Sequence, residues 1–302
     1  MQNFINQLSE ILEKQYILTR DEDKAPYLTD WRKRFTGKAF AVLLPSTSNE
    51  VAAIVRLCAQ HQIALVPQGG HTGFCGGATP DNSGKQVILN LKRMNQIREI
   101  DIANQTITLE AGCILQAVQE KAAENGYLFP LSLGAEGSCM IGGNLATNAG
   151  GTNVLRYGNT RDLCLGLEVV TAKGEIWNGI KGLRKDNTGY DLRDLFIGSE
   201  GTLGIITAAV MKLYPLPVSQ WTTLVACESI ASTIALLTLF QKRANALLTG
   251  FEMMTRESLD LNEKHFPQMA NPLQGNPPYT VLIELSDHES EEHVRRSEER
   301  RV

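Results

Sequence analysis

The sequence predicts a mixed fold of helices and strands in two parts, and three observations lead to this prediction. Segments with helical and strand-like spacing of apolar residues alternate along the first 215 residues. Three glycine-rich stretches, 67–77, 134–151 and 198–204, interrupt them. The prolines of Tyr214-Pro-Leu-Pro217 then mark a boundary near residue 215. The predicted parts are an N-terminal helical segment, 1–34, a main domain, 35–215, and a smaller domain, 216–302.

The first elements follow from apolar spacing and from one capping signal. Apolar residues at helical spacing predict an amphipathic helix over 3–18. A short apolar run predicts a strand over 39–44, which ends before Pro45. Thr47 and Glu50 form the pattern of a capping box, which begins a helix carrying apolar residues as far as Cys58. The next strand, 63–66, leads directly into the first glycine-rich stretch.

The remaining elements of the main domain are mostly strands. Strands are expected over 86–91, 97–101 and 106–110, and a helix over 113–125 should end before Gly126. Two strands, 165–171 and 175–177, flank an Ala-Lys-Gly turn and predict a hairpin, and a long apolar strand follows over 203–213.

The smaller domain is expected to contain a strand over 221–226, a helix over 229–243 and a strand over 279–285. The charged residues that follow carry almost no apolar side chains, so this domain is expected to be incomplete. His288 and His293 in this tail are five residues apart, not the four that place two histidines on one helix face. A solvated tail is therefore expected, and no metal site.

Composition excludes several classes of protein. The 302 residues are 43% hydrophobic and 21% charged, with a formal charge of −4, which is typical of a soluble globular protein and argues against nucleic-acid binding. The six cysteines form no C-x-x-C pair, so reduced thiols and a cytoplasmic location are expected. The N-terminus has neither a basic segment nor a continuous apolar core, so neither a signal peptide nor a transmembrane segment is expected.

The glycine-rich stretches indicate a nucleotide. The first has five glycines among residues 69–77, and such a loop lets backbone amides close on phosphate. Three stretches favour an extended nucleotide over a lone phosphate. The alternative is that the glycines only form turns, but turns alone rarely need paired glycines three times. The chain has no G-x-G and no P-loop motif, which excludes the Rossmann and P-loop geometries. The second stretch adds small polar side chains that suit a planar ring and a ribityl chain, or it is a capped helix N-terminus, which can itself bind an anion.

Four motifs, in order, resemble the flavin domain of the vanillyl-alcohol oxidase/p-cresol methylhydroxylase superfamily. They are Pro67-Gln-Gly-Gly-His-Thr-Gly73, Gly142-Gly-Asn-Leu-Ala-Thr-Asn-Ala-Gly-Gly151, Arg184-Lys-Asp-Asn-Thr-Gly-Tyr-Asp-Leu192 and Ile197-Gly-Ser-Glu-Gly-Thr-Leu-Gly-Ile-Ile206. Within this superfamily the chain is most similar to the D-2-hydroxyglutarate and D-lactate dehydrogenase branch, over about 35–215 and more weakly to 285. The resemblance implies an α+β fold: a two-subdomain p-cresol methylhydroxylase-type FAD-binding fold followed by an incomplete α/β substrate (cap) domain.

The resemblance also implies a reaction. The flavin would accept hydride at N5 from a D-2-hydroxy acid of the 2-hydroxyglutarate or lactate type, giving the 2-oxo acid. In this branch the catalytic histidine, the metal ligands and the substrate arginine lie in a C-terminal half that would begin after residue 285. No catalytic residue is therefore assigned, a divalent metal is expected only in a full-length form, and the electron acceptor is unknown. A homodimer is one option. The alternatives are an inactive FAD-binding module and a D-lactate or glycolate type oxidase that uses dioxygen.

The cofactor-binding residues that the resemblance implies come from all three stretches. The first stretch, with 68–73 around the pyrophosphate, contributes Pro67, Gln68, Gly69, Gly70, His71, Thr72, Gly73, Gly76 and Gly77. Those expected along the ribityl and pyrophosphate path are Leu133, Gly134, Gly137 and Ser138. Those expected by the isoalloxazine are Gly142, Gly143, Asn144, Thr147, Gly150 and Gly151, with Asn148 among them in sequence. Those expected on the adenine side are Glu200, Gly201 and Ile205, with Gly204 beside them in sequence.

Two groups of residues leave alternatives open. In some oxidases of the superfamily a histidine at the position of His71 is bonded to the flavin 8α carbon, whereas the dehydrogenase branch has asparagine there and holds FAD without a covalent bond. Non-covalent FAD is the expectation, and attachment through His71 is the alternative. Arg184, Lys185 and Asp186 could attract a substrate carboxylate or the flavin anion, but their spacing favours a solvated charge cluster.

Overall fold

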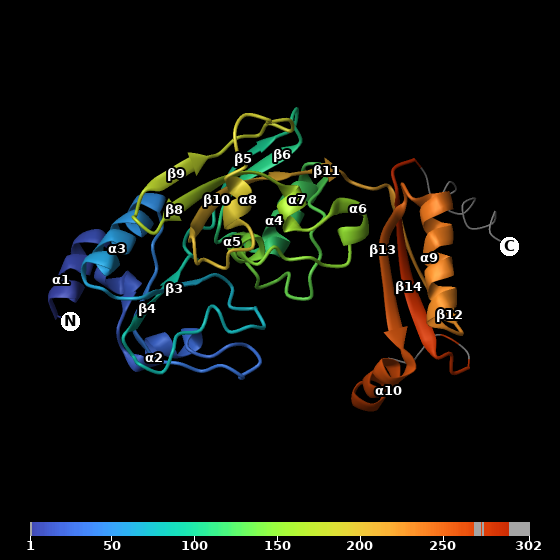
Figure 1. Cartoon of the computed structure of the whole chain (residues 1–302), viewed down its shortest axis with the longest axis horizontal. Helices are drawn as coiled ribbons and strands as arrows, with labels where there is room; N and C mark the ends of the chain where they lie inside the picture. The colour runs from blue at the N-terminus through green and yellow to red at the C-terminus, as the bar shows by residue number, and fades with distance from the viewer. Residues whose placement is uncertain (1, 269–272, 274, 290–302) are drawn as a thin grey trace. The chain divides into compact units, whose positions relative to one another are not determined.

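The computed structural model describes residues 2–268, 273 and 275–289, and their contacts divide the chain into two compact units (Figure 1). The first unit comprises 1–129, 134–149 and 159–214, and the second comprises 130–133, 150–158 and 215–302. The chain passes from the first unit to the second between Tyr214 and Pro215. Two earlier segments also belong to the second unit, so the units are interleaved in sequence where the predicted domains are contiguous.

The first sheet of the first unit has four strands in the order β1-β2-β4-β3. Strands β2, β4 and β3 are parallel, and β1 is antiparallel to β2. Apolar residues of this sheet, including Val42, Val66 and Ile88, form a buried cluster, and α1 packs beside α3. The strands are β1 (Ile17–Leu18), β2 (Ala39–Leu43), β3 (Leu65–Gln68) and β4 (Gln86–Asn90), and the helices are α1 (Gln2–Ile11), α2 (Asp21–Lys24) and α3 (Ser48–Gln60), with 3-10 turns η1 (Lys14–Tyr16) and η2 (Ala25–Tyr27).

The predicted helix over 3–18 is wrong in its second half. Helix α1 ends at Ile11, and Ile17 and Leu18 form β1 instead. Ile17 pairs with Leu43 in the sheet and is buried, so strand pairing outweighs the helical spacing of the local sequence. The strand predicted over 63–66 likewise begins two residues later, at Leu65.

The capping box at the start of α3 is confirmed. The Thr47 hydroxyl accepts a hydrogen bond from the Glu50 amide at 3.1 Å, and the Glu50 carboxylate accepts one from the Thr47 amide at 3.2 Å. The same carboxylate accepts a second bond from the Ser46 amide at 2.6 Å. The box therefore satisfies donors that the first turn of a helix leaves without partners.

The second sheet of the first unit is antiparallel, with the order β5-β6-β10-β8-β9. The predicted hairpin is confirmed as β8 and β9, and its turn has Gly174 at a φ of +73°. Helix α4 ends before Gly126, whose φ is +79°. The strands are β5 (Ile97–Asp101), β6 (Thr106–Glu110), β8 (Cys164–Thr171), β9 (Ile176–Gly179) and β10 (Gly204–Lys212), with β7 (Tyr127–Leu128) and β11 (Tyr214–Pro215) forming a separate pair, and the helices are α4 (Leu115–Glu124), α5 (Ile141–Ala146), α7 (Thr160–Leu163) and α8 (Arg193–Phe196).

Replacing Glu168, on β8, by glutamine is expected to lower the free energy of unfolding at pH 7 by about 1–3 kcal/mol, because Glu168 accepts charge-assisted hydrogen bonds. Its carboxylate accepts from the hydroxyls of Ser48 at 2.5 Å and Thr207 at 2.8 Å, and Arg98 lies 3.5 Å away. Burial alone would raise the pKa of Glu168, but these three partners hold its pKa below the ordinary 4.5. The stabilisation is therefore present above pH 4.5 and is lost as the pH falls through the lowered pKa.

Urea unfolding of the wild-type protein and of Glu168→Gln at pH 7 and at about pH 3 measures this effect. The difference between the two proteins should shrink at the lower pH, because protonation of Glu168 removes the charge that strengthens these hydrogen bonds. A difference of equal size at both pH values would contradict the expectation.

The second unit contains an antiparallel sheet in the order β12-β14-β13, with β14 in the centre. Helix α9 packs on this sheet through a core that includes Phe240, Leu248 and Ile283. The elements are α6 (Val154–Tyr157), β12 (Ser219–Cys227), α9 (Ile230–Ala244), β13 (Leu248–Thr255), α10 (Arg256–His265) and β14 (Tyr279–Asp287).

The strand, helix and strand predicted for the smaller domain are confirmed as β12, α9 and β14. Strand β13 and helix α10 lacked a sequence signal, because Gly250 and Glu252 break the apolar pattern of β13. His293 and most of the predicted solvated tail lie outside the described residues.

Candidate cofactor site

The three glycine-rich stretches meet in the first unit. A Cβ atom built on Gly70 would lie 2.1 Å from the carbonyl oxygen of Ser138, so only glycine allows the first stretch to approach the second this closely. A Cβ atom on Gly201 would lie 3.1 Å from Pro67, which brings the third stretch against the first. The amide of Glu200 donates to the carbonyl of Ala146 at 2.8 Å, which joins the third stretch to the end of α5.

Residues 69–77 of the first stretch form a loop between β3 and β4. We call it the amide loop. Among the residues that the structure describes, none accepts a hydrogen bond from a backbone amide of this loop. A Cβ atom on Gly73 would meet no atom within 4 Å. Free donors on a loop with open space beside it suit an anionic ligand such as phosphate.

His71 holds a strained position in the amide loop. Its φ is +57°, a left-handed conformation that a side chain other than glycine rarely adopts. Its Nε2 lies 2.9 Å from the hydroxyl of Thr79, with which it shares a hydrogen bond. Burial lowers the pKa of His71, and the nearby charge of Asp30 only partly opposes this effect. The imidazole is therefore held neutral and in one orientation near pH 7.

Asp30 supports this region from an earlier turn. Its buried carboxylate accepts hydrogen bonds from the amides of Phe35 at 2.7 Å and Arg32 at 3.2 Å. These backbone hydrogen bonds, that from Phe35 foremost, lower the pKa of Asp30. Phe35 in turn packs on Gly76, where a Cβ atom would lie 2.8 Å from its ring. The turn around Asp30 therefore fixes the far end of the amide loop.

Helix α5 begins in the second stretch and exposes one face to open space. A Cβ atom on Gly143 would meet nothing within 4 Å, whereas one on Gly142 would lie 2.7 Å from the Cβ atom of Ala111. Asn144 is only 4% exposed, and its Nδ2 donates to Cys139 Sγ at 3.5 Å. Its Oδ1 is buried and has no hydrogen-bond partner among the described residues. A buried acceptor without a donor is costly, and a ligand donor would remove that cost.

Other predicted residues of the second stretch are distributed over both units. Gly134, Gly137, Ser138, Thr147 and Asn148 belong to the first unit. The second unit contains Leu133, Gly150 and Gly151. Gly151 has a φ of +135°, and a Cβ atom there would lie 2.1 Å from the carbonyl oxygen of Ser132, so its glycine identity has a local structural reason.

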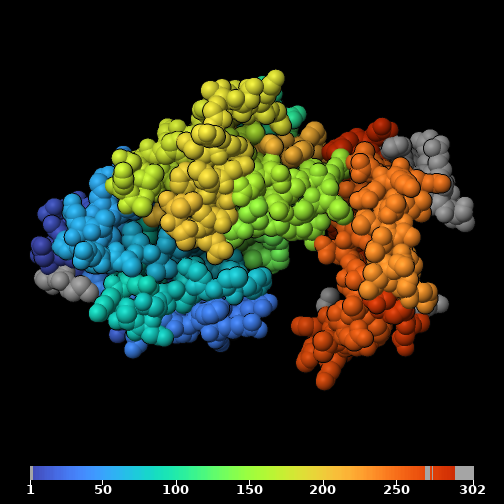
Figure 2. All heavy atoms as spheres, in the orientation of Figure 1, coloured from blue at the N-terminus to red at the C-terminus, as the bar shows by residue number. Residues whose placement is uncertain are grey.

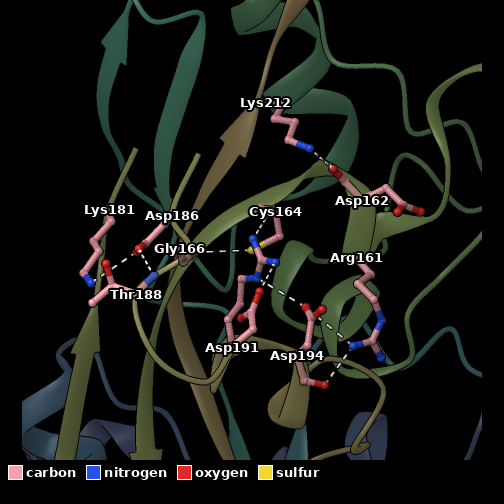
Figure 3. A network of polar contacts seen from close by, with 11 residues as sticks. Arg161, Asp162, Cys164, Gly166, Lys181, Asp186, Thr188, Asp191, Asp194 and Lys212 are labelled. Carbon is pink, nitrogen blue, oxygen red and sulfur yellow. Dashed lines mark hydrogen bonds and ion pairs between the residues drawn. The ribbon is translucent and has the colours of Figure 1, made fainter. Parts of the chain in front are cut away.

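Arg161, on α7, gave no signal in the sequence, and Figure 3 shows its side chain directed toward Asp194. Its amide donates to Asn148 Oδ1 at 3.0 Å, and this bond holds Asn148 at a φ of +45°. Its guanidinium donates to the carbonyls of Asp194 at 2.8 Å and Ile197 at 2.7 Å, directly before Gly198. Arg161 therefore holds the backbone directly before the third stretch.

Of the residues predicted in the third stretch, Gly204 and Ile205 begin β10.

The charged motif at 184–192 lies on the surface of the first unit, in yellow in Figure 2. Arg184 donates to the carbonyls of Asn104 at 3.0 Å and Gln105 at 3.3 Å, and Lys181 pairs with Asp186 at 3.5 Å. Lys185 is exposed. Arg184 is therefore engaged with the β5–β6 turn, which agrees with the interpretation of the motif as a solvated cluster.

Comparison with known proteins gives a match to a domain family over part of the chain. Residues 39–179 match the family described as "FAD binding domain". The chain therefore contains an FAD-binding domain. The free donors of the amide loop and the unpartnered Asn144 Oδ1 are features that such a cofactor fits, since FAD offers a pyrophosphate and several hydrogen-bond donors.

Curated relatives confirm the predicted resemblance. The chain is 42% identical over 270 residues to bovine (Bos taurus) mitochondrial D-2-hydroxyglutarate dehydrogenase, covering 89% of this chain and 49% of that protein. It is 39% identical to the enzyme of the same name from Arabidopsis thaliana, covering 93% and 50%, and 35% identical to the Saccharomyces cerevisiae D-2-hydroxyglutarate–pyruvate transhydrogenase, covering 88% and 53%. The chain thus spans about half the length of these relatives.

Solved structures confirm the predicted fold class. Alkyldihydroxyacetonephosphate synthase matches with a TM-score of 0.82 at 19% identity, covering 99% of this chain and 57% of that one. Substrate-bound p-cresol methylhydroxylase matches with a TM-score of 0.75 at 20% identity, covering 99% and 62%. The FAD-binding domain therefore has the p-cresol methylhydroxylase-type α+β fold.

Three further features bear on the predicted partners. All six cysteines are free. Within 2–268, 273 and 275–289, no helix is long and apolar enough to cross a membrane, and no three His, Cys, Asp or Glu side chains gather as metal ligands would. The word "mitochondrial" in the relatives' names describes those proteins, and the cytoplasmic location expected for this chain stays a prediction.

Proposed function

We propose that this chain binds FAD and acts as the flavin-binding half of a D-2-hydroxy acid dehydrogenase of the 2-hydroxyglutarate or lactate type. The observation that carries the proposal is the meeting of three glycine-rich stretches beside an amide loop with free donors. The first two stretches lie within the residues 39–179 that match the FAD-binding domain family, and the relatives of the chain include D-2-hydroxyglutarate dehydrogenases at about 40% identity.

The residues have distinct roles in this proposal. The amides of Gly69 to Gly73 hold the pyrophosphate, since backbone donors stabilise anionic oxygens. Gly143 leaves room for the flavin, and Asn144 Oδ1 accepts a hydrogen bond from one of its donors. Glu200, Gly201 and Ile205 line the adenine side. When bound, FAD supplies the hydride acceptor for oxidation of the α-carbon of the hydroxy acid. The chain orients the cofactor and shields it from water.

We propose that FAD is held without a covalent bond. His71 Nε2 already shares a hydrogen bond with Thr79, which favours a role for His71 in shaping the amide loop. Acid precipitation of the FAD-loaded protein should therefore leave all flavin absorbance in the supernatant. Flavin absorbance that stays with the washed precipitate, and is lost in His71→Ala, would establish the covalent alternative instead.

The proposal is tested in two steps with the full chain. Titration with FAD, followed by flavin fluorescence and calorimetry, should show saturable binding at one site. The FAD-loaded protein is then mixed with D-2-hydroxyglutarate or D-lactate and a dye acceptor, with the L-isomers as controls. Reduction of the dye by a D-isomer alone supports the dehydrogenase, and a protein that does not bind FAD contradicts the proposal.

A second candidate is an FAD-binding module without turnover. The observation that favours it is that the chain spans about half the length of its curated relatives. Saturable FAD binding with no dye reduction by any of the four acids would support the module. Peroxide formation from dioxygen would instead support an oxidase.

A further inference from the structure

Two buried amide side chains lie directly beneath the amide loop. Gln68 ends β3 and Asn90 ends β4, and the two residues are register partners in the parallel sheet. They are only 2% and 4% exposed. Buried amides in a sheet core need a reason, because each must have all its hydrogen bonds satisfied to avoid a cost.

These two side chains form a hydrogen bond with each other, and each also donates a hydrogen bond to the backbone at one end of the amide loop. We call this pair the clamp. Asn90 Nδ2 donates to Gln68 Oε1 at 3.1 Å and to the carbonyl of Gly69, the first loop residue, at 3.0 Å. Gln68 Nε2 donates to the carbonyl of Ala78, directly after the loop, at 2.8 Å, and to that of Tyr27 at 3.0 Å. Asn90 Oδ1 accepts from the Lys92 amide at 3.0 Å, so the nitrogen and the oxygen of both side-chain amides have hydrogen-bond partners.

The clamp determines the direction of the loop amides. In a trans peptide the carbonyl and the next amide point in opposite directions. The bond from Asn90 to the Gly69 carbonyl therefore turns the Gly70 amide away from the protein interior. The close approach of Gly70 to Ser138 leaves this peptide little freedom to rotate. At the other end of the loop, Thr79 directly follows Ala78, and its hydroxyl forms a hydrogen bond with His71.

We propose that Gln68 and Asn90 are positioning residues that hold the amide loop in its binding shape, and that they thereby make the site select a flavin that carries a diphosphate over one that lacks it. This inference rests on the proposed function. A loop whose donors are already aimed at the ligand loses little conformational entropy on binding. Without the clamp, the donors must be ordered by the diphosphate itself, and only ligands that contain it lose affinity.

The test compares FAD with riboflavin, which has the flavin ring and ribityl chain but no phosphate. Asn90→Leu keeps the size of the side chain and removes its hydrogen bonds. The affinity for FAD should fall by about tenfold or more, whereas that for riboflavin should change by less than about threefold. Asn104→Leu is the matched control, because Asn104 Nδ2 also donates to a glycine carbonyl, that of Gly182 at 2.7 Å, outside the amide loop. It should leave both affinities unchanged.

The outcomes separate the inference from the proposed function. If the wild-type protein binds FAD more tightly than riboflavin and Asn90→Leu weakens both equally, or neither, the positioning role is overturned and the proposed function stands. If the wild-type protein does not bind FAD, both are overturned. If Asn90→Leu does not fold, Gln68→Met is used instead. It removes the hydrogen bonds to Ala78 and Tyr27 with a side chain of nearly the same length, and its affinities for FAD and riboflavin are compared in the same way.

Discussion

Gly70→Ala is expected to abolish measurable FAD binding and to lower the free energy of unfolding by about 1–3 kcal/mol, the usual cost of forcing extra volume into a packed site. The added Cβ atom would lie 2.1 Å from the carbonyl oxygen of Ser138 and 2.9 Å from Cys139 Cα. Both atoms belong to the backbone, so no side chain can rotate to make room. The first and second glycine-rich stretches must then separate, and the FAD site depends on their contact.

Gly73→Ala is the control for this change. It lies in the same loop, a Cβ atom there meets nothing within 4 Å, and its φ is not in the left-handed region. Its stability should equal that of the wild-type protein or exceed it by a few tenths of a kcal/mol. Urea unfolding and FAD titration measure both effects. Wild-type stability in Gly70→Ala would show that the two stretches do not meet as described.

Gly143→Ala is expected to move stability and FAD affinity in opposite directions. Alanine is favoured over glycine in a helix by about 1 kcal/mol, and the new methyl group meets no atom of the protein. The protein without FAD should therefore unfold at a higher urea concentration. If the flavin takes the open space beside Gly143, the methyl group enters it, and the affinity should fall by about tenfold or more.

Gly142→Ala, one residue earlier in α5, is the matched comparison. Its Cβ atom would lie 2.7 Å from that of Ala111, so this variant should lose stability. Calorimetry and urea unfolding of the two variants distinguish steric effects within the protein from steric effects on the ligand. An FAD affinity that is unchanged in Gly143→Ala would remove Gly143 from the proposed flavin site.

The sequence predicted those structural features that depend on residues close together in the chain. The capping box of α3 and the turn at Gly174 depend on residues within a few positions of each other, and both are confirmed. The four motifs predicted the fold and the cofactor class through their resemblance to a known flavin domain. The end of the first helix was wrong because Ile17 pairs with Leu43, which the local pattern cannot show.

The supporting residues of the site could not be predicted for the same reason. Asn90 acts on Gly69 from 21 positions away, and the Arg161 amide bonds Asn148 from 13 positions away. Neither residue stands in a motif, and each matters only through the fold that brings it to its partner. The predicted FAD contacts themselves stay predictions, to be tested by the variants above.

The interleaving of the two units has a consequence for the order in which the chain folds during synthesis. Residues 150–158 leave the ribosome long before β13 and β14, although α6 packs on β13 and Arg156 donates to the carbonyl of Ser286 at 3.0 Å. The second unit therefore completes its contacts only once residues near 287 have emerged. Until β13 and β14 have been synthesised, α6 lacks the strand on which it packs in the folded unit.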